Sequence, residues 1–281
     1  MNEYSVNTLK IIAIIVFLSL VPILFLFPNS SAIVWTIVIP IVPIFLLIVG
    51  YSNWRKICTL AFFSTLSQKL TWIEKRKVSR WFEENFYYFQ YFILFVAFNA
   101  RLVVLNFDNF YLGLFFIAVV IISFLINLVF TGKSWCNFFC PVGVVEKIYT
   151  LSDSLNYNSN SSCSTCSACK KNCPDIDPES NYWKENINNQ KSFVFYSFPG
   201  LVLGFYLYFY MQSGSLSYYF SGDWANGYAS MFSSGFFFAP FIPTILAAPI
   251  TLAILSLVSF YIFDSLEKLL WKKKFFKNIV F

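Results

Sequence analysis

Residues 110–130 read FYLGLFFIAVVIISFLINLVF, and residues 131–143 continue directly with TGKSWCNFFCPVG. The first segment has no charged side chain and is long enough to cross a bilayer as a helix, since a span needs about 20 apolar residues. The second segment carries Cys136 and Cys140 immediately beyond the span. This stretch therefore predicts a transmembrane helix that ends in a thiol-bearing turn.

The composition of the whole chain extends this prediction. Of its 281 residues, 58% are hydrophobic and only 12% are charged, which is not the composition of a soluble globular protein. Apolar runs of sufficient length fall at 11–27, 33–51, 86–107, 110–130, 193–212 and 244–263. We therefore expect an all-α polytopic membrane protein with about six transmembrane helices in a lipid bilayer.

The positions of Lys and Arg predict the orientation of these spans. Segments 51–85, 131–192 and 265–281 carry most of the 20 cations, whereas the connections 28–32, 108–109 and 213–243 carry none. If Lys10 precedes the first span, 19 cations lie on one side, and Arg101 inside a span is the exception. The positive-inside rule then places both termini in the cytoplasm and the chain in the inner (plasma) membrane. Anionic headgroups, and not nucleic acid, are the expected partners of these cations.

A second cysteine pattern lies in the longest polar segment. Residues 163–173 read CSTCSACKKNC and are followed by Pro174, which is the C-x2-C-x2-C-x3-C-P spacing of bacterial ferredoxins. This spacing predicts a [4Fe–4S] cluster in a small ferredoxin-like iron–sulfur insert. Structural zinc more often takes two C-x2-C pairs separated by a longer insert, so zinc is the weaker alternative. The predicted ligands are Cys163, Cys166, Cys169 and Cys173.

Cys136 and Cys140 match the second half of the same motif, because Pro141 follows Cys140. In two-cluster ferredoxins, the cysteine before proline ligates the cluster of the other motif. By that precedent Cys140 would complete the cluster of the first three motif cysteines, and Cys173 would join Cys136 on a second cluster. The alternative is a single cluster on the four motif cysteines, with Cys136 and Cys140 in a structural role.

Cys58 is the remaining cysteine of the chain. Two clusters held only by cysteine need eight thiolates, and the chain has seven. Residues 53–61, NWRKICTLA, resemble a degenerate copy of SWCNFFCPVG in which Cys58 matches Cys140 and Trp54 matches Cys136. This match suggests an internal duplication, with Cys58 on the second cluster beside Cys136 and Cys173 and a fourth site that is open or not cysteine. A buried free thiol is the alternative.

The combination of W-C-x3-C-P-x-G at a membrane boundary with a following ferredoxin motif resembles the membrane-bound [4Fe–4S] polyferredoxins of the NapH/NosR type. Proteins of that type accompany periplasmic nitrate reductase and nitrous-oxide reductase or assemble cytochrome oxidase. The family pattern has two W-C-x3-C-P motifs, whereas this chain has one intact copy and lacks the large extra domains of the NosR branch. The resemblance covers mainly residues 50–180.

The motifs predict a domain order and a function. We expect a membrane domain of four helices at 1–130 with a basic cytoplasmic loop at 51–85. A cytoplasmic iron–sulfur segment at 131–192, two transmembrane helices at 193–264 and a basic cytoplasmic tail at 265–281 would follow. Such a chain would relay electrons through one or two [4Fe–4S] clusters, to or from quinone or a partner reductase, as a component and not as a self-contained enzyme. The alternative is an assembly or redox-sensing factor for a redox complex.

The redox partner and the excluded cofactors follow from single residue types. Lys170 and Lys171 would steer an acidic partner such as ferredoxin, flavodoxin or a reductase subunit, or are simply solvated. The chain has no His, which excludes bis-His haem, a Rieske centre and Ser-His-Asp catalysis. The spans carry no acid near their centres, which disfavours a transporter.

Three further segments have predicted roles. Arg101 would pair with Asp108 on the same helix face or, alternatively, would contact a quinone headgroup. Residues 54–70 are amphipathic and would lie along the inner leaflet. In the loop 213–243, the aromatic residues favour a belt at the membrane interface over a substrate site. These aromatic residues are Tyr218, Tyr219, Trp224 and Tyr228.

The orientation is testable by labelling intact cells. A membrane-impermeant thiol reagent should label none of the cysteines, because all of them are expected in or near the cytoplasm, while a reporter placed at Ser234 should be accessible from outside. Labelling of Cys58 or Cys163 from the outside would overturn the orientation.

Overall fold

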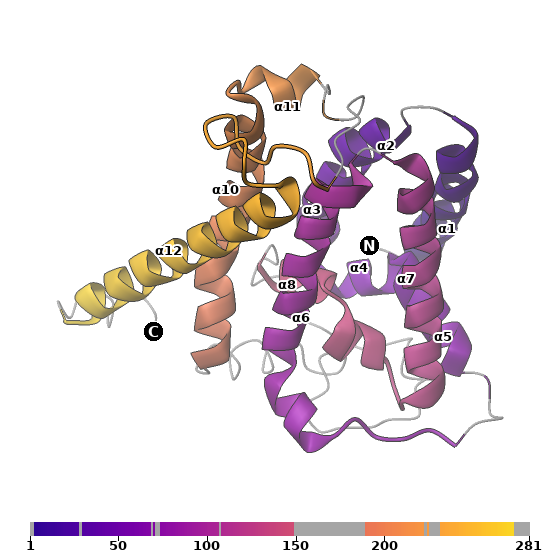
Figure 1. Cartoon of the computed structure of the whole chain (residues 1–281). Helices are drawn as coiled ribbons and strands as arrows, with labels where there is room; N and C mark the ends of the chain where they lie inside the picture. The colour runs from indigo at the N-terminus through magenta and orange to yellow at the C-terminus, as the bar shows by residue number, and fades with distance from the viewer. Residues whose placement is uncertain are drawn as a thin grey trace. The chain divides into compact units, whose positions relative to one another are not determined.

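A computed structural model describes residues 3–27, 30–68, 70, 74–106, 108–148, 189–221, 224 and 231–272. Within these ranges the chain is helical and pairs as strands only at isolated bridges (Figure 1). The predicted ferredoxin-like insert, with Cys163, Cys166, Cys169 and Cys173, lies outside them. The α-helices are α1 (Glu3–Leu26), α2 (Ser30–Ile33), α3 (Ile39–Val49), α4 (Tyr51–Ile57), α5 (Thr59–Gln68), α6 (Arg80–Ala100), α7 (Asn109–Val129), α8 (Val142–Ile148), α10 (Asn189–Ser213), α11 (Ser217–Ser221) and α12 (Thr244–Lys272). Short π-helices are η1 (Val34–Val38), η2 (Arg101–Leu105) and η3 (Trp135–Phe139).

The described helices confirm an all-helical protein with six candidate membrane spans. These spans are Tyr4–Leu26, Ser30–Val49, Asn85–Leu105, Asn109–Val129, Ser192–Ser213 and Thr244–Leu269. The first span begins earlier than the predicted run at 11–27, so Lys10 lies inside it and not ahead of it. The Lys10 ammonium stands 5.2 Å from the centre of the Phe62 ring, and this contact partly offsets the cost of a cation within the helix.

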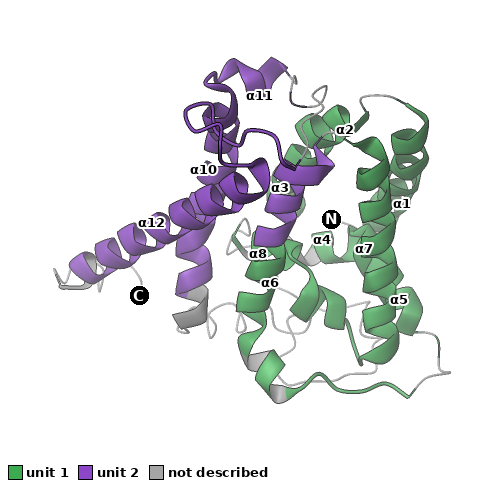
Figure 2. Cartoon of the chain, viewed as in Figure 1, with its two compact units in different colours: residues 1–94, 108–187 green, residues 95–107, 188–281 purple. Residues whose placement is uncertain are grey.

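The chain forms two compact units, coloured separately in Figure 2. Unit 1 comprises residues 1–94 and 108–187, and unit 2 comprises residues 95–107 and 188–281. Unit 1 therefore contains the first two spans, the fourth span and roughly the first half of the third. Unit 2 contains the end of the third span and the last two.

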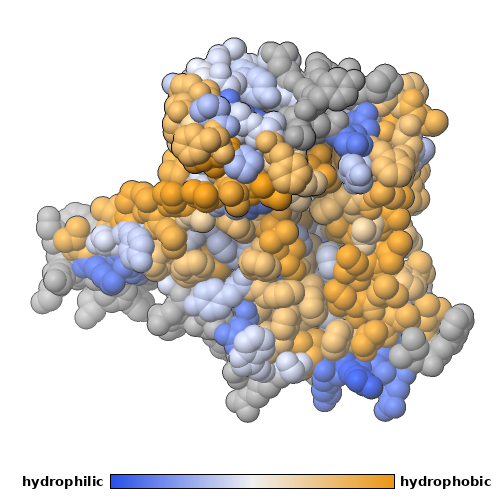
Figure 3. All heavy atoms as spheres, in the orientation of Figure 1, coloured by the Kyte–Doolittle hydropathy of each residue, from blue (hydrophilic) through white to orange (hydrophobic). Residues whose placement is uncertain are grey.

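In unit 1, α7 packs against α1 and α5. The Phe17 and Phe116 rings meet edge-on at 5.8 Å between centroids. A Cβ atom on Gly113 would lie 2.7 Å from the Phe25 ring, so glycine permits close approach of the two helices here. Asn109 joins the turn between the first two spans to the start of α7, because its Oδ1 accepts from the Ser31 amide at 2.9 Å. Figure 3 shows apolar side chains over α7, with hydrophilic ones gathered beyond its carboxyl end.

Side chains and backbone from other segments satisfy the carbonyl groups at the carboxyl end of α7, which a helix itself leaves unpaired. The Gln68 amide donates to the Asn127 carbonyl and, at 3.1 Å, to the Phe130 carbonyl. The Arg76 amide donates to the Val129 carbonyl at 2.8 Å. The Asn127 side chain in turn accepts from the Trp135 amide at 3.2 Å. The start of the cysteine-bearing turn is thus held by the end of the helix that precedes it.

Residues 54–70 were predicted to form one amphipathic segment, and the structure divides them. Helix α4 ends at Ile57, Cys58 has extended backbone, and α5 begins at Thr59. Helix α5 buries small and polar side chains, among them Ser64 and Ser67, against its neighbours α7 and η3. It is therefore a packed helix of unit 1 and not one that only lies along a leaflet.

In unit 2, α10 and α12 pack together through glycine. A Cβ atom on Gly200 would lie 2.1 Å from the Leu255 carbonyl oxygen, which is closer than any atom tolerates. Gly204, one turn later, completes the small-x3-small spacing typical of tight helix pairs in membranes. The Ser259 hydroxyl donates to the Tyr196 carbonyl at 2.6 Å and adds a polar contact across the pair.

In the loop between α10 and α12, Trp224 departs from the predicted interface belt. Trp224 is fully buried, and its indole N–H donates to the Tyr219 carbonyl at 3.0 Å. The Arg101 guanidinium lies over the rings of Trp224 and Phe205, at 4.7 and 5.2 Å from their centres. Trp224 is therefore a packing residue of this loop, while Tyr228 lies outside the described residues. Arg101 is buried under aromatic side chains, and this contact accommodates its charge inside the third span.

Asp108 has a local role that the sequence analysis did not assign. Its Oδ1 accepts from the amides of Phe110 and Tyr111 at 2.7 and 3.2 Å. These bonds make Asp108 the N-cap of α7, where a carboxylate also interacts favourably with the helix dipole.

Alanine at Gly200 should destabilise the α10–α12 pair. The added Cβ meets backbone that cannot yield, so we expect a loss of about 1–3 kcal/mol in unfolding free energy. The matched control is Gly204→Ala, whose Cβ would meet the flexible end of Leu252 at 3.2 Å and should cost less. Thermal unfolding in detergent measures both variants. Equal stability of the two would contradict the packing described here.

Candidate metal centre

Cys58 and Cys140 occupy equivalent positions in two turns of unit 1. Each directly follows a short helix and has non-helical backbone dihedral angles, with φ −52°, ψ 126° at Cys58 and φ −66°, ψ 120° at Cys140. The amide of each remains bonded to the helix behind it, to the Trp54 carbonyl and the Trp135 carbonyl respectively, at 2.8 Å in both cases. The two cysteines thus have similar dihedral angles, although the Cys58 amide bonds to the carbonyl four residues back in an α-helix and the Cys140 amide to the one five residues back in a π-helix.

A glycine stands eight residues ahead of each cysteine. Gly50 has φ 77° and Gly132 has φ 74°, values that side-chain-bearing residues adopt only with strain. Gly50 directly follows the second span, and Gly132 follows the fourth span within three residues. The two copies therefore share the same order of apolar span, left-handed glycine, short helix and cysteine, and this similarity of backbone supports the duplication inferred from sequence.

The three described cysteines lie near one another. The pKa of the Cys58 thiol is raised to about 12, chiefly by burial and to a smaller extent by nearby Cys136 and Glu146. Burial also raises the pKa of Cys140 well above its ordinary value, and Glu146, Cys136 and Cys58 add to the effect through their negative charge. The tertiary structure has therefore gathered three thiols and a carboxylate, and thiols become metal ligands only when they lose their protons to the bound metal.

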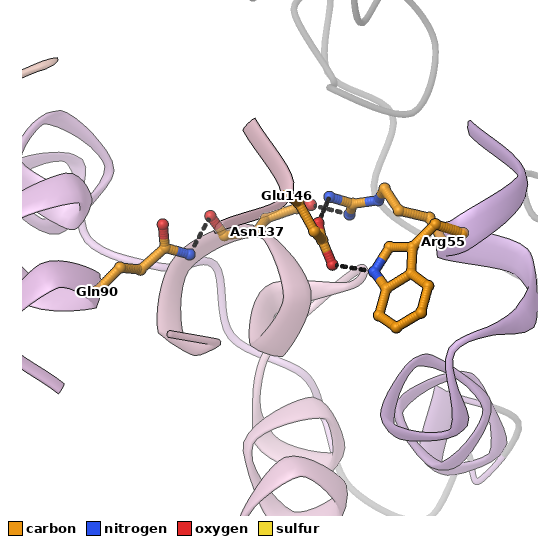
Figure 4. A network of polar contacts seen from close by, with 5 residues as sticks. Arg55, Gln90, Asn137 and Glu146 are labelled. Carbon is orange, nitrogen blue, oxygen red and sulfur yellow. Dashed lines mark hydrogen bonds and ion pairs between the residues drawn. The ribbon is translucent and has the colours of Figure 1, made fainter. Parts of the chain in front are cut away.

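A polar network joins the two turns, as Figure 4 shows. Arg55 Nη2 donates to Asn137 Oδ1 at 2.5 Å, and Arg55 Nη1 lies 3.8 Å from Glu146 Oε2. Glu146 Oε1 accepts from the Trp54 indole at 2.7 Å. Gln90 extends the network by donating to the Asn137 carbonyl at 3.3 Å. These contacts link α4 to η3 and α8, so they fix the distance between the turns.

Aromatic packing holds the second turn against α6. The Phe139 ring stacks on Phe82 at 4.8 Å, and the Phe138 ring meets Phe86 edge-on at 5.4 Å. Both phenylalanines of η3 are next to Cys140, so their packing restricts where that cysteine lies. Gly143 permits close approach here, because a Cβ atom on it would lie 2.9 Å from the Gln90 side-chain nitrogen.

The spacing of the three thiols bears on which metal would fit them. Within the described residues, no three Cys, Asp or Glu side chains converge as the ligands of one metal ion. Thiolates around a single zinc lie only about 3.8 Å apart, given Zn–S bonds of about 2.3 Å. A cubane takes each thiolate on a different iron and so spreads them more widely.

The structure brings together part of the predicted site. Cys58, Cys136 and Cys140 share one region, whereas the crossed-ligand scheme placed Cys140 on a different cluster from the other two. Sequence reasoning missed Arg55, Asn137, Glu146 and Gln90. The sequence contains one signal that could have indicated two of these residues. Arg55 lies three residues before Cys58, and Asn137 lies three residues before Cys140.

No family model, curated protein or solved structure matches this chain. The likeness to the membrane polyferredoxins therefore stays a prediction that rests on the cysteine motifs of residues 50–180.

Removal of Arg55 should destabilise unit 1. The Arg55 and Glu146 side chains are only 6% and 8% exposed, so Arg55→Met would leave a buried carboxylate without its cation. The expected loss is about 3–5 kcal/mol of unfolding free energy. Adding Glu146→Gln should recover part of this loss, because Gln keeps an acceptor for Trp54 and carries no charge. Denaturant unfolding in detergent measures the double-mutant cycle, and strictly additive losses would contradict a coupled pair.

Proposed function

We propose that this protein is a membrane electron-transfer protein that relays electrons through [4Fe–4S] clusters, to or from quinone or a partner reductase. The observation that carries the proposal is the gathering of three cysteines at two equivalent turns that follow membrane spans. The ferredoxin spacing of residues 163–173 supports it independently. Two sets of thiols in one membrane chain without His favour iron–sulfur chemistry over haem or zinc.

Two groups of residues would hold the clusters. The four motif cysteines, Cys163 to Cys173, form one set by spacing, and Cys58, Cys136 and Cys140 form the other by position. A bound cluster supplies one-electron exchange. The protein contributes burial, the nearby cation of Arg55 and the rigidity of the polar network, which are the means by which a chain adjusts a cluster's potential.

The cation distribution supports a cytoplasmic position for both termini and for the cysteine segment. Arg55 and Lys56 lie in α4 beside Cys58, and Lys75 and Arg76 lie in the segment that meets the end of α7. A reducing compartment keeps thiolates available for clusters, which agrees with that side of the plasma membrane. Lys170 and Lys171 would then favour an acidic partner such as ferredoxin or flavodoxin.

Anaerobic purification tests the proposal. The full-length protein should contain iron and acid-labile sulfide, and Cys166→Ala should remove a cubane signal from its electron paramagnetic resonance (EPR) spectrum. Ser164→Ala, a change inside the same motif at a position without a thiol, is the matched control and should keep the signal. Zinc in place of iron would refute the proposal. Fast reduction or oxidation of the clusters by added quinol or quinone supports a relay, whereas slow exchange would indicate an assembly or sensing factor.

A further inference from the structure

We propose that Cys58, Cys136 and Cys140 together hold a second iron–sulfur cluster, built across the two copies of the internal repeat, in which Trp54 stands where a fourth thiolate would be. This inference rests on the proposed function, because it takes iron–sulfur chemistry as the occupant of the site. It assigns all seven cysteines, four to the ferredoxin motif and three to this second site. It also replaces the crossed arrangement expected from two-cluster ferredoxins.

The first argument is the symmetry of the contact between the two turns. Arg55 and Asn137 are equivalent residues of the two copies, and they bond to each other at 2.5 Å. Direct contact between equivalent residues is what a local twofold arrangement of the two copies would produce. Cys58 and Cys140 lie three residues beyond Arg55 and Asn137 respectively, so the bond holds the two cysteine-bearing turns beside each other.

The second argument is the reciprocity of the surrounding contacts. In a twofold arrangement, a contact from the first copy to the second has a counterpart in the opposite direction. Trp54 of the first turn bonds to Glu146 in α8 of the second copy. In the opposite direction, η3 of the second turn packs against α5 of the first copy. Helices α5 and α8 each follow their own cysteine, so the two turns enclose one shared region.

The third argument identifies the missing ligand. Cys136 lies four residues before Cys140, and the residue four before Cys58 is Trp54. A fully symmetric site would therefore have four cysteines, which is the number that a [4Fe–4S] cluster takes from protein. Trp54 instead directs its indole N–H to Glu146. One iron is thus left without a thiolate from the repeat, and we infer that water or a small exogenous ligand completes it.

The charge balance of the site agrees with a cationic occupant. Three thiolates and the Glu146 carboxylate would be strongly repulsive in a buried region without compensation. Arg55 supplies one cation through its ion pair with Glu146. The irons of a cluster would supply the remainder, as metal binding to buried thiolates generally does.

The symmetry makes a gain-of-ligand experiment possible. Trp54→Cys adds a thiol at the position equivalent to Cys136, while Asn53→Cys is a control that adds a thiol on the same helix, turned about 100° away. The wild-type protein, purified anaerobically, should contain about eight irons per chain, at four for each cluster. Brief exposure to air should remove iron from the open corner in the wild type and in Asn53→Cys. Loss of that iron should give the EPR signal of a three-iron cluster. The Trp54→Cys variant should retain its iron and should not show this signal.

A loss-of-ligand series gives the opposite test. Cys58→Ser and Cys140→Ser should each lower the iron content from about eight to about four while the ferredoxin-motif signal persists. If a variant folds poorly, alkylation of the wild type under denaturing conditions provides the same information. Cys58, Cys136 and Cys140 should resist the reagent while the cluster is bound. All three should react together once the cluster has been removed.

The outcomes separate this inference from the proposed function. Absence of iron from the wild-type protein would refute both the electron-transfer proposal and the second cluster. About four irons per chain, unchanged in Cys58→Ser and lost in Cys166→Ala, would overturn the second cluster and leave the electron-transfer proposal standing. Loss of the same EPR signal in Cys58→Ser and in Cys173→Ser would overturn the assignment of four and three and restore the crossed scheme.

Discussion

The hydrogen bond from Arg55 to Asn137 links the two turns on which the candidate site depends. It joins the residues three positions before Cys58 and Cys140 at 2.5 Å, and the Arg55–Glu146 ion pair and the Trp54–Glu146 bond surround it. Buried charges are stable only when they are paired and hydrogen bonded, so this network admits few alternative arrangements. The consequence is that cysteines more than 75 residues apart in the chain lie in one region.

The same principle operates at the end of α7. A helix leaves its last carbonyls unpaired, and in or near hydrocarbon no bulk water satisfies them. Here the Gln68 side chain and the Arg76 backbone amide donate hydrogen bonds to these carbonyls. The Asn127 side chain accepts a hydrogen bond from the Trp135 amide and so connects the helix end to the next turn. In unit 2 the corresponding constraint is close packing, because Gly200 allows α12 to approach α10. The hydrophobic effect does not drive helices together inside a bilayer. Hydrogen bonds to buried polar groups and close packing at small residues therefore hold these helices together.

Much of the fold follows from local properties of the sequence, and the exceptions have particular causes. The six spans could be predicted because apolar length alone decides whether a helix can cross a bilayer. Lys10 was placed outside the first span because a charge usually ends one, but the Phe62 ring accommodates its ammonium. Trp224 was assigned to the interface because tryptophan often lies there. The Arg101 guanidinium and the Phe209 ring, which are distant in sequence, cover it instead.

The spans, the cation asymmetry, the ferredoxin spacing and the possible match of Cys58 to Cys140 can all be read from residue types and their spacing along the chain. That Cys58, Cys136 and Cys140 share one region, with Arg55 and Glu146 paired beside them, became visible in the folded chain. The physical reason is that such contacts depend on how two distant turns pack. Packing is set by the combined shapes and polar groups of many helices, and no local pattern encodes it.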